Sequence, residues 1–396
     1  MKKTLILAAT LVGSLSVQEV AAVDLQKLSD DGKASMNFRY RFEGVDQDGI
    51  AEHASASTLR SRFTWVSGKS DGFSVGIETD YVSVIGSEDY NSTANGNGQF
   101  PVVADPEGFD LNRAYFTYEG DGMRADFGRQ RIVHGSQRFV GGVAWRQNEQ
   151  TYDALRLQPK LADWTIDYAY VWNVNRIFGP DDGAQPGDWY GNSHFLVAGR
   201  PLSKGHSVEA FAYLLDFENA NGPPNSTSTW GAGYKGTFGP VKLAAVLATQ
   251  SDYSDSPLSY SANFYSLQAD IKIAPVTLTL GHEVLGSDEG RVGFKTPLAT
   301  LHKFQGWTDK FLGTPAAGLQ DTFVGVKGKV GKVGVNLMWH TFSADEGGAD
   351  FGDEVNVVLN YAVSKRLSFQ LKAADYSTDG FATDTTKVWL TSMFKI

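Results

Sequence analysis

Apolar and polar side chains alternate along most of this chain in segments of strand length. The alternation is clear near the end of the chain, in 333–341, 354–363, 367–373 and 387–394. A period of two gives each strand one apolar and one polar face. No helical segment interrupts the pattern after the first two dozen residues. We therefore expect an all-β fold, a transmembrane antiparallel β-barrel with apolar side chains towards lipid and polar side chains towards a water-filled lumen.

Eighteen segments fit this pattern, with boundary errors of several residues that leave 16 strands as the alternative. They are 33–44, 57–67, 73–85, 109–119, 123–131, 151–159, 164–174, 193–200, 207–217, 228–238, 241–251, 262–273, 276–285, 321–330, 333–343, 353–363, 367–377 and 384–394.

Short and long connections alternate between these segments. Tight turns rich in Gly, Pro, Asp and Ser, such as 239–240 and 331–332, follow every second segment. All tight turns then lie on one rim, which is periplasmic in outer-membrane barrels and carries both termini. Two longer connections, 132–150 and 286–320, are long enough to fold into or over the pore, although the pattern does not decide whether they do.

The first residues are typical of a secretory signal. Lys2 and Lys3 precede an apolar run to Val17, and Ala22 ends a small-residue cleavage pattern. The run is too short to span a bilayer, which takes about 20 residues. We expect a signal peptide at 1–22 and a single barrel domain at 23–396, located in the outer membrane of a Gram-negative bacterium.

Composition agrees with an exported barrel. The chain has no cysteine, and its mean hydropathy is −0.25, a value that a barrel can have because only alternate strand residues face lipid. A net charge of −10 argues against a nucleic-acid partner. The expected partners are outer-membrane lipid, the barrel-assembly machinery and a permeating solute. We expect no cofactor, no metal site and no catalytic residue.

Arginine is concentrated in the first half of the chain, where 13 of 15 arginines lie between Arg39 and Arg200. In 33–44 and 57–67 the arginines alternate with outward apolar residues and so point inward, about 4.8 Å apart across neighbouring strands. The predicted pore-lining, anion-binding set is Arg39, Arg41, Arg60, Arg62, Arg113, Arg129, Arg131, Arg138, Arg146 and Arg156.

Two interpretations of this set remain open. Guanidinium groups stay charged and bind carboxylates through two donors, so they would lower the barrier to anions in a narrow pore. Alternatively, they pair with lumen carboxylates and only brace the wall. The candidate carboxylates are Glu43, Glu78, Asp80, Asp110, Asp126 and Asp153.

Two long connections contain more arginine, amide and aromatic side chains than a solvent-exposed loop needs. Arginines, amides and one indole in 127–148 could bind carboxylates and stack on a sugar ring, and 300–312 is both polar and aromatic. The alternative is an ordered outer loop with an aromatic core. The sugar-stacking or constriction candidates are His134, Gln137, Trp145, His302, Lys303, Trp307 and Lys310.

Several short motifs resemble the alginate-export family of outer-membrane β-barrels. They are Gly128-Arg129-Gln130, His134–Arg138 with Gly141 and Trp145, Tyr152–Arg156, and Leu301–Trp307 with Asp309-Lys310-Phe311. The resemblance implies an 18-stranded barrel and an arginine-lined lumen that passes an anionic uronate polymer. This chain is shorter than expected of a dedicated alginate exporter, which favours a related porin of unassigned substrate, with sugar acids as one candidate.

Two other classes of function compete with a channel. An outer-membrane hydrolase could be built from His134, His302 or His340 with nearby serines or carboxylates, but the sequence has no nucleophile elbow and no HExxH motif. A non-transport, carbohydrate-binding surface β protein would bury its apolar faces against each other. It would not need interface aromatics such as Trp65 and Trp230. The sequence decides neither the direction of transport nor the oligomeric state.

Overall fold

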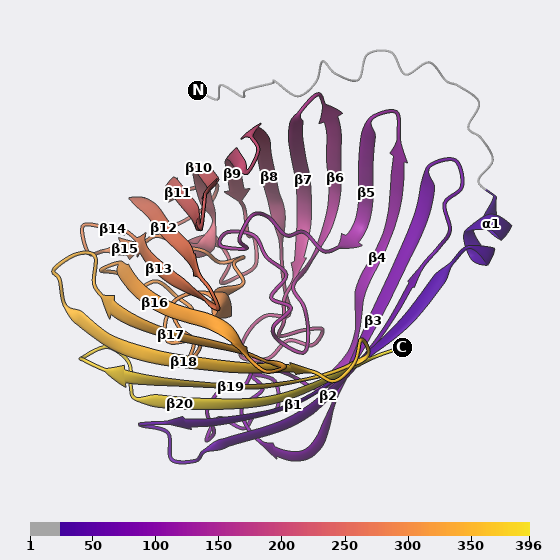
Figure 1. The fold of residues 1–396 in the computed structure, drawn as a ribbon. Helices are drawn as coiled ribbons and strands as arrows, with labels where there is room; N and C mark the ends of the chain where they lie inside the picture. The colour runs from indigo at the N-terminus through magenta and orange to yellow at the C-terminus, as the bar shows by residue number, and fades with distance from the viewer. Residues whose placement is uncertain (1–23) are drawn as a thin grey trace.

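The computed structural model describes residues 24–396 and consists mainly of one 18-stranded sheet that closes on itself. Each strand pairs antiparallel with the next along the chain, β13 (Val276–Leu285) pairs with β16 (Leu319–Val330), and β20 (Thr385–Lys395) pairs with β1 (Lys33–Gln47). Figure 1 shows the resulting ring of strands. The predicted barrel of 18 strands is confirmed, and the alternative of 16 is wrong.

All the predicted strand segments are strands in the structure, within a few residues at each end. The remaining barrel strands are β2 (Ala54–Val66), β3 (Phe73–Asp89), β4 (Gly108–Gly120), β5 (Met123–Gln130), β6 (Thr151–Leu161), β7 (Trp164–Asn175), β8 (Asp188–Ser203), β9 (His206–Leu215), β10 (Thr227–Phe238), β11 (Val241–Asp252), β12 (Ser261–Ile273), β17 (Val333–Ser343), β18 (Asp350–Ala362) and β19 (Leu367–Thr378).

A few short elements lie outside the barrel sheet. The expectation of no helix is wrong at α1 (Leu25–Asp30), which Asp24 caps by accepting a hydrogen bond from the Lys27 amide. The connection between β13 and β16 contains a small hairpin, β14 (Ser287–Asp288) and β15 (Val292–Gly293), and one 3₁₀ turn, η2 (Leu301–Lys303). Another 3₁₀ turn, η1 (Pro223–Asn225), precedes β10. The predicted signal sequence and its cleavage site lie outside the described residues.

Within residues 24–396 no helix is long and apolar enough to cross a bilayer. The outer surface of the barrel is formed by its strands. Large apolar side chains point outward along them, including Phe116, Leu247, Leu267 and Leu371, and between 46% and 66% of the surface of each is exposed. A belt of this kind is what lipid requires of a barrel exterior.

Tight turns and long loops lie on opposite rims, as predicted. Eight short turns form one rim, called the turn rim here, and nine longer connections form the other, the loop rim. Both ends of the barrel lie at the turn rim, where the Met36 and Ile396 backbones exchange two hydrogen bonds. In outer-membrane barrels this rim faces the periplasm.

The lumen is not simply polar, which corrects the expectation of a water-filled interior. Inward side chains of the middle strands, among them Phe195, Phe211 and Phe264, form a buried apolar cluster with Val140 and Leu298. The latter two residues belong to the loops 131–150 and 286–318, named here the first and second lumen loops. The cluster fixes both loops against one side of the barrel wall, because loop segments taken out of water need apolar contacts to be stable.

The two lumen loops are joined to each other as well as to the wall. Val140 and Leu298 form a parallel β-bridge, and the Thr300 hydroxyl donates a 2.7 Å hydrogen bond to the Gln137 side chain. Arg138 of the first loop pairs with Glu283 of β13 at 2.8 Å, and both are buried. Figure 1 shows these chain segments inside the ring of strands. The question that the sequence left open is therefore answered: both loops enter the lumen.

The outward face of β11 gives a test of the membrane orientation. Leu247→Arg places a charge in the apolar belt and should destabilise the barrel folded in lipid vesicles by about 2–4 kcal/mol. Gln268→Arg on the inward face of β12 is the matched control and should reduce the stability of the folded barrel much less. Urea titration of vesicle-folded protein measures both. Equal losses would show that Leu247 does not face lipid.

Candidate functional site

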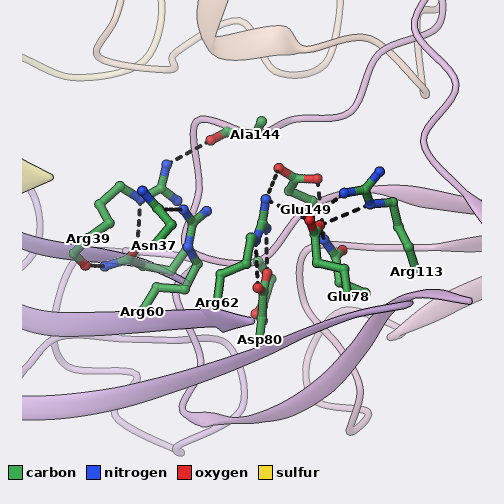
Figure 2. A network of polar contacts seen from close by, with 12 residues as sticks. Asn37, Arg39, Arg60, Arg62, Glu78, Asp80, Arg113, Ala144 and Glu149 are labelled. Carbon is green, nitrogen blue, oxygen red and sulfur yellow. Dashed lines mark hydrogen bonds and ion pairs between the residues drawn. The ribbon is translucent and has the colours of Figure 1, made fainter. Parts of the chain in front are cut away.

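Four arginines on β1 and β2 form the basic patch that the sequence predicts. Arg39 lies directly opposite Arg60 in the strand register, while Asn37 pairs with Arg62 and Arg41 with Thr58. All four arginines point inward and are no more than 8% exposed. Figure 2 shows Arg39, Arg60 and Arg62 in a row along this wall.

One part of the patch is balanced by carboxylates. Arg62 binds Asp80 at 2.6 Å and Glu149 of the first lumen loop at 2.7 Å. Arg113 binds Glu78 at 3.0 Å, and Arg131 binds Glu149 at 2.8 Å. Burial by itself would raise the pKa of the loop carboxyl Glu149, but Arg62 and Arg131 lower it to about 2. In this group the arginines join strands and loop through their acidic partners.

Most of the other predicted arginines are also paired with acids. Arg129 binds Asp153 at 2.8 Å, Arg156 binds Asp167 at 2.8 Å, and Arg146 binds Glu43 at 2.9 Å. These pairs join neighbouring strands, or a loop and the wall, and so stabilise the barrel. Their positive charges are largely offset by their partners.

Arg39 and Arg60 differ from this group. Among the described residues, no carboxylate oxygen lies within 4.0 Å of either guanidinium. Arg39 donates to the Ala144 carbonyl and to the Gln147 amide oxygen, each at 2.9 Å. Arg60 donates to the Asn37 amide oxygen at 2.6 Å, and its Nε has no partner within residues 24–396. Two adjacent buried cations are thus solvated only by neutral oxygens, as Figure 2 shows.

Trp145 of the first lumen loop lies next to this patch. Its carbonyl accepts a 2.7 Å hydrogen bond from Arg41, whose guanidinium also lies 4.1 Å from the centre of the indole. The His302 ring of the second lumen loop stacks on the same indole at 4.1 Å. A continuous stack therefore runs from the β1 wall through both loops.

A short polar relay extends this stack. His302 donates through Nδ1 to Asp309 at 2.7 Å, and its Nε2 accepts from Lys372 of β19 at 2.5 Å. Burial lowers the pKa of His302 to about 3, so the ring is neutral near pH 7 and can accept from the ammonium. The Lys372 Nζ lies 3.7 Å from the centre of the Trp307 ring and 4.1 Å from that of Trp145. Such close aromatic faces stabilise a cation.

The remaining predicted loop residues hold the loops in place. His134 stacks on Tyr213, the Lys303 ammonium donates to the Ser136 carbonyl at 2.8 Å, and the Lys310 ammonium donates to Thr383 at 3.3 Å. The Trp307 amide donates to the buried carboxylate of Glu354. Of the candidates for sugar stacking, Trp145 and Trp307 are partly exposed and line one of the lumen cavities, whereas His134 is buried against Phe195 and Tyr213.

Three cavities meet around Trp145. The loop-side cavity has about 810 Å³ and is lined by Arg146, Arg176, Lys310 and Lys387, among others. A turn-side cavity of about 420 Å³ contains Arg39, Arg41, Lys329 and Lys332 and has no acidic residue in its lining. A second turn-side cavity of about 640 Å³ lies beside Lys372 and Trp307. Trp145 lines all three, so it separates the loop-side space from the turn-side space.

The sequence did not identify the Lys372 site. Alternation along 367–377 does place Lys372 in the lumen, but nothing in the strand shows that two loop tryptophans and His302 converge on it. The sequence likewise did not show the partners of Glu149, which come from β2 and from its own loop. Contacts of this kind depend on where the loops fold, and hydrophobic periodicity carries no such information.

The comparisons with known proteins agree with this architecture. Residues 33–176 match the family model described as alginate export. The structure is similar to OccAB4 of Acinetobacter baumannii (TM-score 0.72, 13% identity, 93% of this chain and 99% of that chain). It is also similar to OpdO of Pseudomonas aeruginosa (TM-score 0.72, 13% identity, 94% and 98% coverage). OpdK of the same organism, crystallised with vanillate, gives a TM-score of 0.70 at 14% identity, with 93% and 99% coverage.

No curated protein sequence matches the chain. The structural neighbours therefore show the fold, and the family model connects the arginine-bearing strands and the first lumen loop with a family. Closure of 18 strands and the apolar outer belt give this chain the fold of these proteins, and its residues 33–176 are similar to the alginate export family.

Proposed function

We propose that this barrel is a passive diffusion channel of the outer membrane that favours small or oligomeric anions, including sugar acids. The observation that carries the proposal is the uncompensated charge of Arg39 and Arg60 next to a cavity lined by four cations and no acid. A dehydrated anion that enters this space would meet guanidinium groups whose charge no carboxylate offsets, in a region of low dielectric constant, where the attraction is strong.

The solute path follows from where the lumen is filled. The apolar cluster contains residues of β6 to β9 and β11 to β13 and, at the loop ends, of β16 to β19, whereas the cavity that contains Arg39 lies along β16 to β20 and β1. A solute from the loop side would pass Arg146 and Lys387, then Trp145, and reach Arg41 and Arg39. Indole faces along this path suit the apolar face of a sugar ring, and the arginines suit its carboxylate.

A hydrolase is the competing function, and the contacts of two of its three candidate histidines argue against it. Both ring nitrogens of His302 are engaged, by Asp309 and Lys372, and His340 Nδ1 is bonded to Asp321 at 2.9 Å. A general base has to reach a nucleophile within about 3 Å. Assays of detergent-solubilised protein on lipid and peptide substrates would detect such an activity, and we expect none.

The unpaired arginines can be tested by ion selectivity. In planar bilayers under a tenfold KCl gradient, the wild-type reversal potential should show anion preference. Arg39→Gln with Arg60→Gln should reduce the ratio of anion to cation permeability by about fivefold or more. The attraction between each lost charge and an anion about 4 Å away is worth roughly 1 kcal/mol even at the dielectric constant of water.

A matched control removes a paired arginine together with its acid. Arg156→Gln with Asp167→Asn keeps the net charge and should leave the reversal potential unchanged. A cation-selective wild-type channel, or an unchanged ratio in the Arg39/Arg60 variant, would refute the anion proposal.

The position of Trp145 predicts a constriction. Trp145→Ala joins the three cavities and should raise single-channel conductance several-fold, because the narrowest segment dominates the resistance of a pore. Trp172→Ala, whose ring packs on the outward-facing Phe127, is the control and should conduct like the wild type. Equal conductance of wild type and Trp145→Ala would place the constriction elsewhere.

A further inference from the structure

A ring of lysines surrounds the inner edge of the turn rim. Residues two apart in a strand share a face, so Lys33 of β1 shares the inward face of Arg39 and Arg41, and Lys160 of β6 shares that of Arg156. On five more strands a lysine lies an even number of residues from a buried inward residue and so shares its face. These inward residues are Thr229, Gln250, Phe264, Asp321 and Trp389. The lysine ring consists of Lys33, Lys160, Lys235, Lys242, Lys272, Lys329 and Lys395.

The charges of this ring are not neutralised. All seven side chains are exposed, and within the part of the chain that the structure describes none has a carboxylate oxygen within 4.0 Å. Neighbouring basic residues at the same level behave differently. Lys327 pairs with Asp270 at 3.4 Å, and Arg124 pairs with Asp126 at 2.8 Å. The ring is thus a surplus of positive charge at the mouth, and of its members only Lys329 also lines the cavity that contains Arg39 and Arg41.

The opposite rim carries the opposite charge. Apart from the two lumen loops, the seven loop-rim connections contain 13 acidic residues and one basic residue, Arg176. These acids are Asp48, Glu52, Asp105, Glu107, Asp181, Asp182, Asp216, Glu218, Asp255, Asp345, Glu346, Asp379 and Asp384. Only Asp105 among them is fully buried, where it lies 3.9 Å from Arg41. The barrel is therefore polarised along its axis, with an acidic loop side and a basic turn side.

We propose that the lysine ring is a capture site for multivalent anions and makes their entry faster from the turn side than from the loop side. The proposal rests on the channel function above, and it adds a sidedness that the buried arginines alone would not give. Like charges lining a mouth raise the local concentration of counter-ions and can increase association rates by about 10–10³-fold at low salt. The acidic loop rim repels the same ions. Spacing of the lysines around several strands favours an anion with several charges over a monovalent one.

Side-specific block of single channels tests this inference. Tripolyphosphate is added to one chamber in 0.1 M KCl, and the rate constant of current block is measured; the other side is tested in a separate membrane. An Ala349→Cys variant, labelled with a membrane-impermeant thiol reagent, identifies the loop side, because the chain has no cysteine of its own and Ala349 is exposed. The block rate constant from the turn side should be at least about tenfold larger.

Two further arms separate the ring from other charges. In 1 M KCl, where the Debye length is about 3 Å, the ratio of the two rates should approach one. Replacing Lys160, Lys235, Lys242 and Lys272 with Gln, none of which lines the cavity of Arg39 and Arg41, should lower only the turn-side rate, about fivefold or more. The control Lys69→Gln, Lys204→Gln and Lys365→Gln removes cations of the turns themselves and should leave both rates near the wild-type values.

Equal rates from both sides at 0.1 M KCl, or a ratio that survives in 1 M KCl, would overturn the inference. So would an unaltered turn-side rate in the four-lysine variant. An anion-selective channel with symmetric block would contradict the lysine ring alone, whereas side-dependent block in a cation-selective channel would contradict the proposed function instead.

Discussion

The rest of the structure depends on one constraint, that backbone N–H and C=O groups facing lipid must all be paired within the protein. Pairing of β20 with β1, in register from Asn37 with Lys395 to Gln47 with Thr385, removes the two edges that a sheet would otherwise leave open. Closure of 18 strands then encloses a lumen that is too wide for the side chains of the wall alone to fill. The alternation of apolar and polar residues, the even number of strands and the common rim for both termini all follow from this closure.

A wide lumen has to be narrowed if the channel is to distinguish solutes, and two loops do this. They are fixed by an apolar cluster on one side of the wall and by buried ion pairs such as Arg138 with Glu283. Because their contacts include a β-bridge and many hydrogen bonds, they act as a fixed part of the pore. One of the free spaces that remain, the cavity of about 420 Å³, lies beside Arg39, which has no acidic partner. Selectivity, in this account, comes from the few charges that the wall leaves unpaired, while the many paired arginines stabilise the barrel.

Sequence reasoning predicted the fold well because its signal is local. Period-two alternation located every strand, and the charges fixed which face of 33–44 and 57–67 points inward. It predicted the site less well. The pairing of Arg62 with Asp80 and Glu149, and the lack of any such partner for Arg60 two residues earlier, depend on where the first lumen loop folds. The apolar inner wall was missed for a related reason. An inward phenylalanine such as Phe264 has no place in a polar lumen, and its position makes sense only once a loop packs on it.

The central claim is that anions occupy the space beside Arg39, Arg41 and Arg60. The most direct measurement is an anomalous difference map from crystals grown in bromide, compared with crystals grown in rubidium chloride. The account predicts bromide within about 3.5 Å of the Arg39 or Arg60 guanidinium, in the cavity that also contains Lys329 and Lys332, and no rubidium there. Rubidium at this position, or bromide bound only at the outer surface, would contradict it.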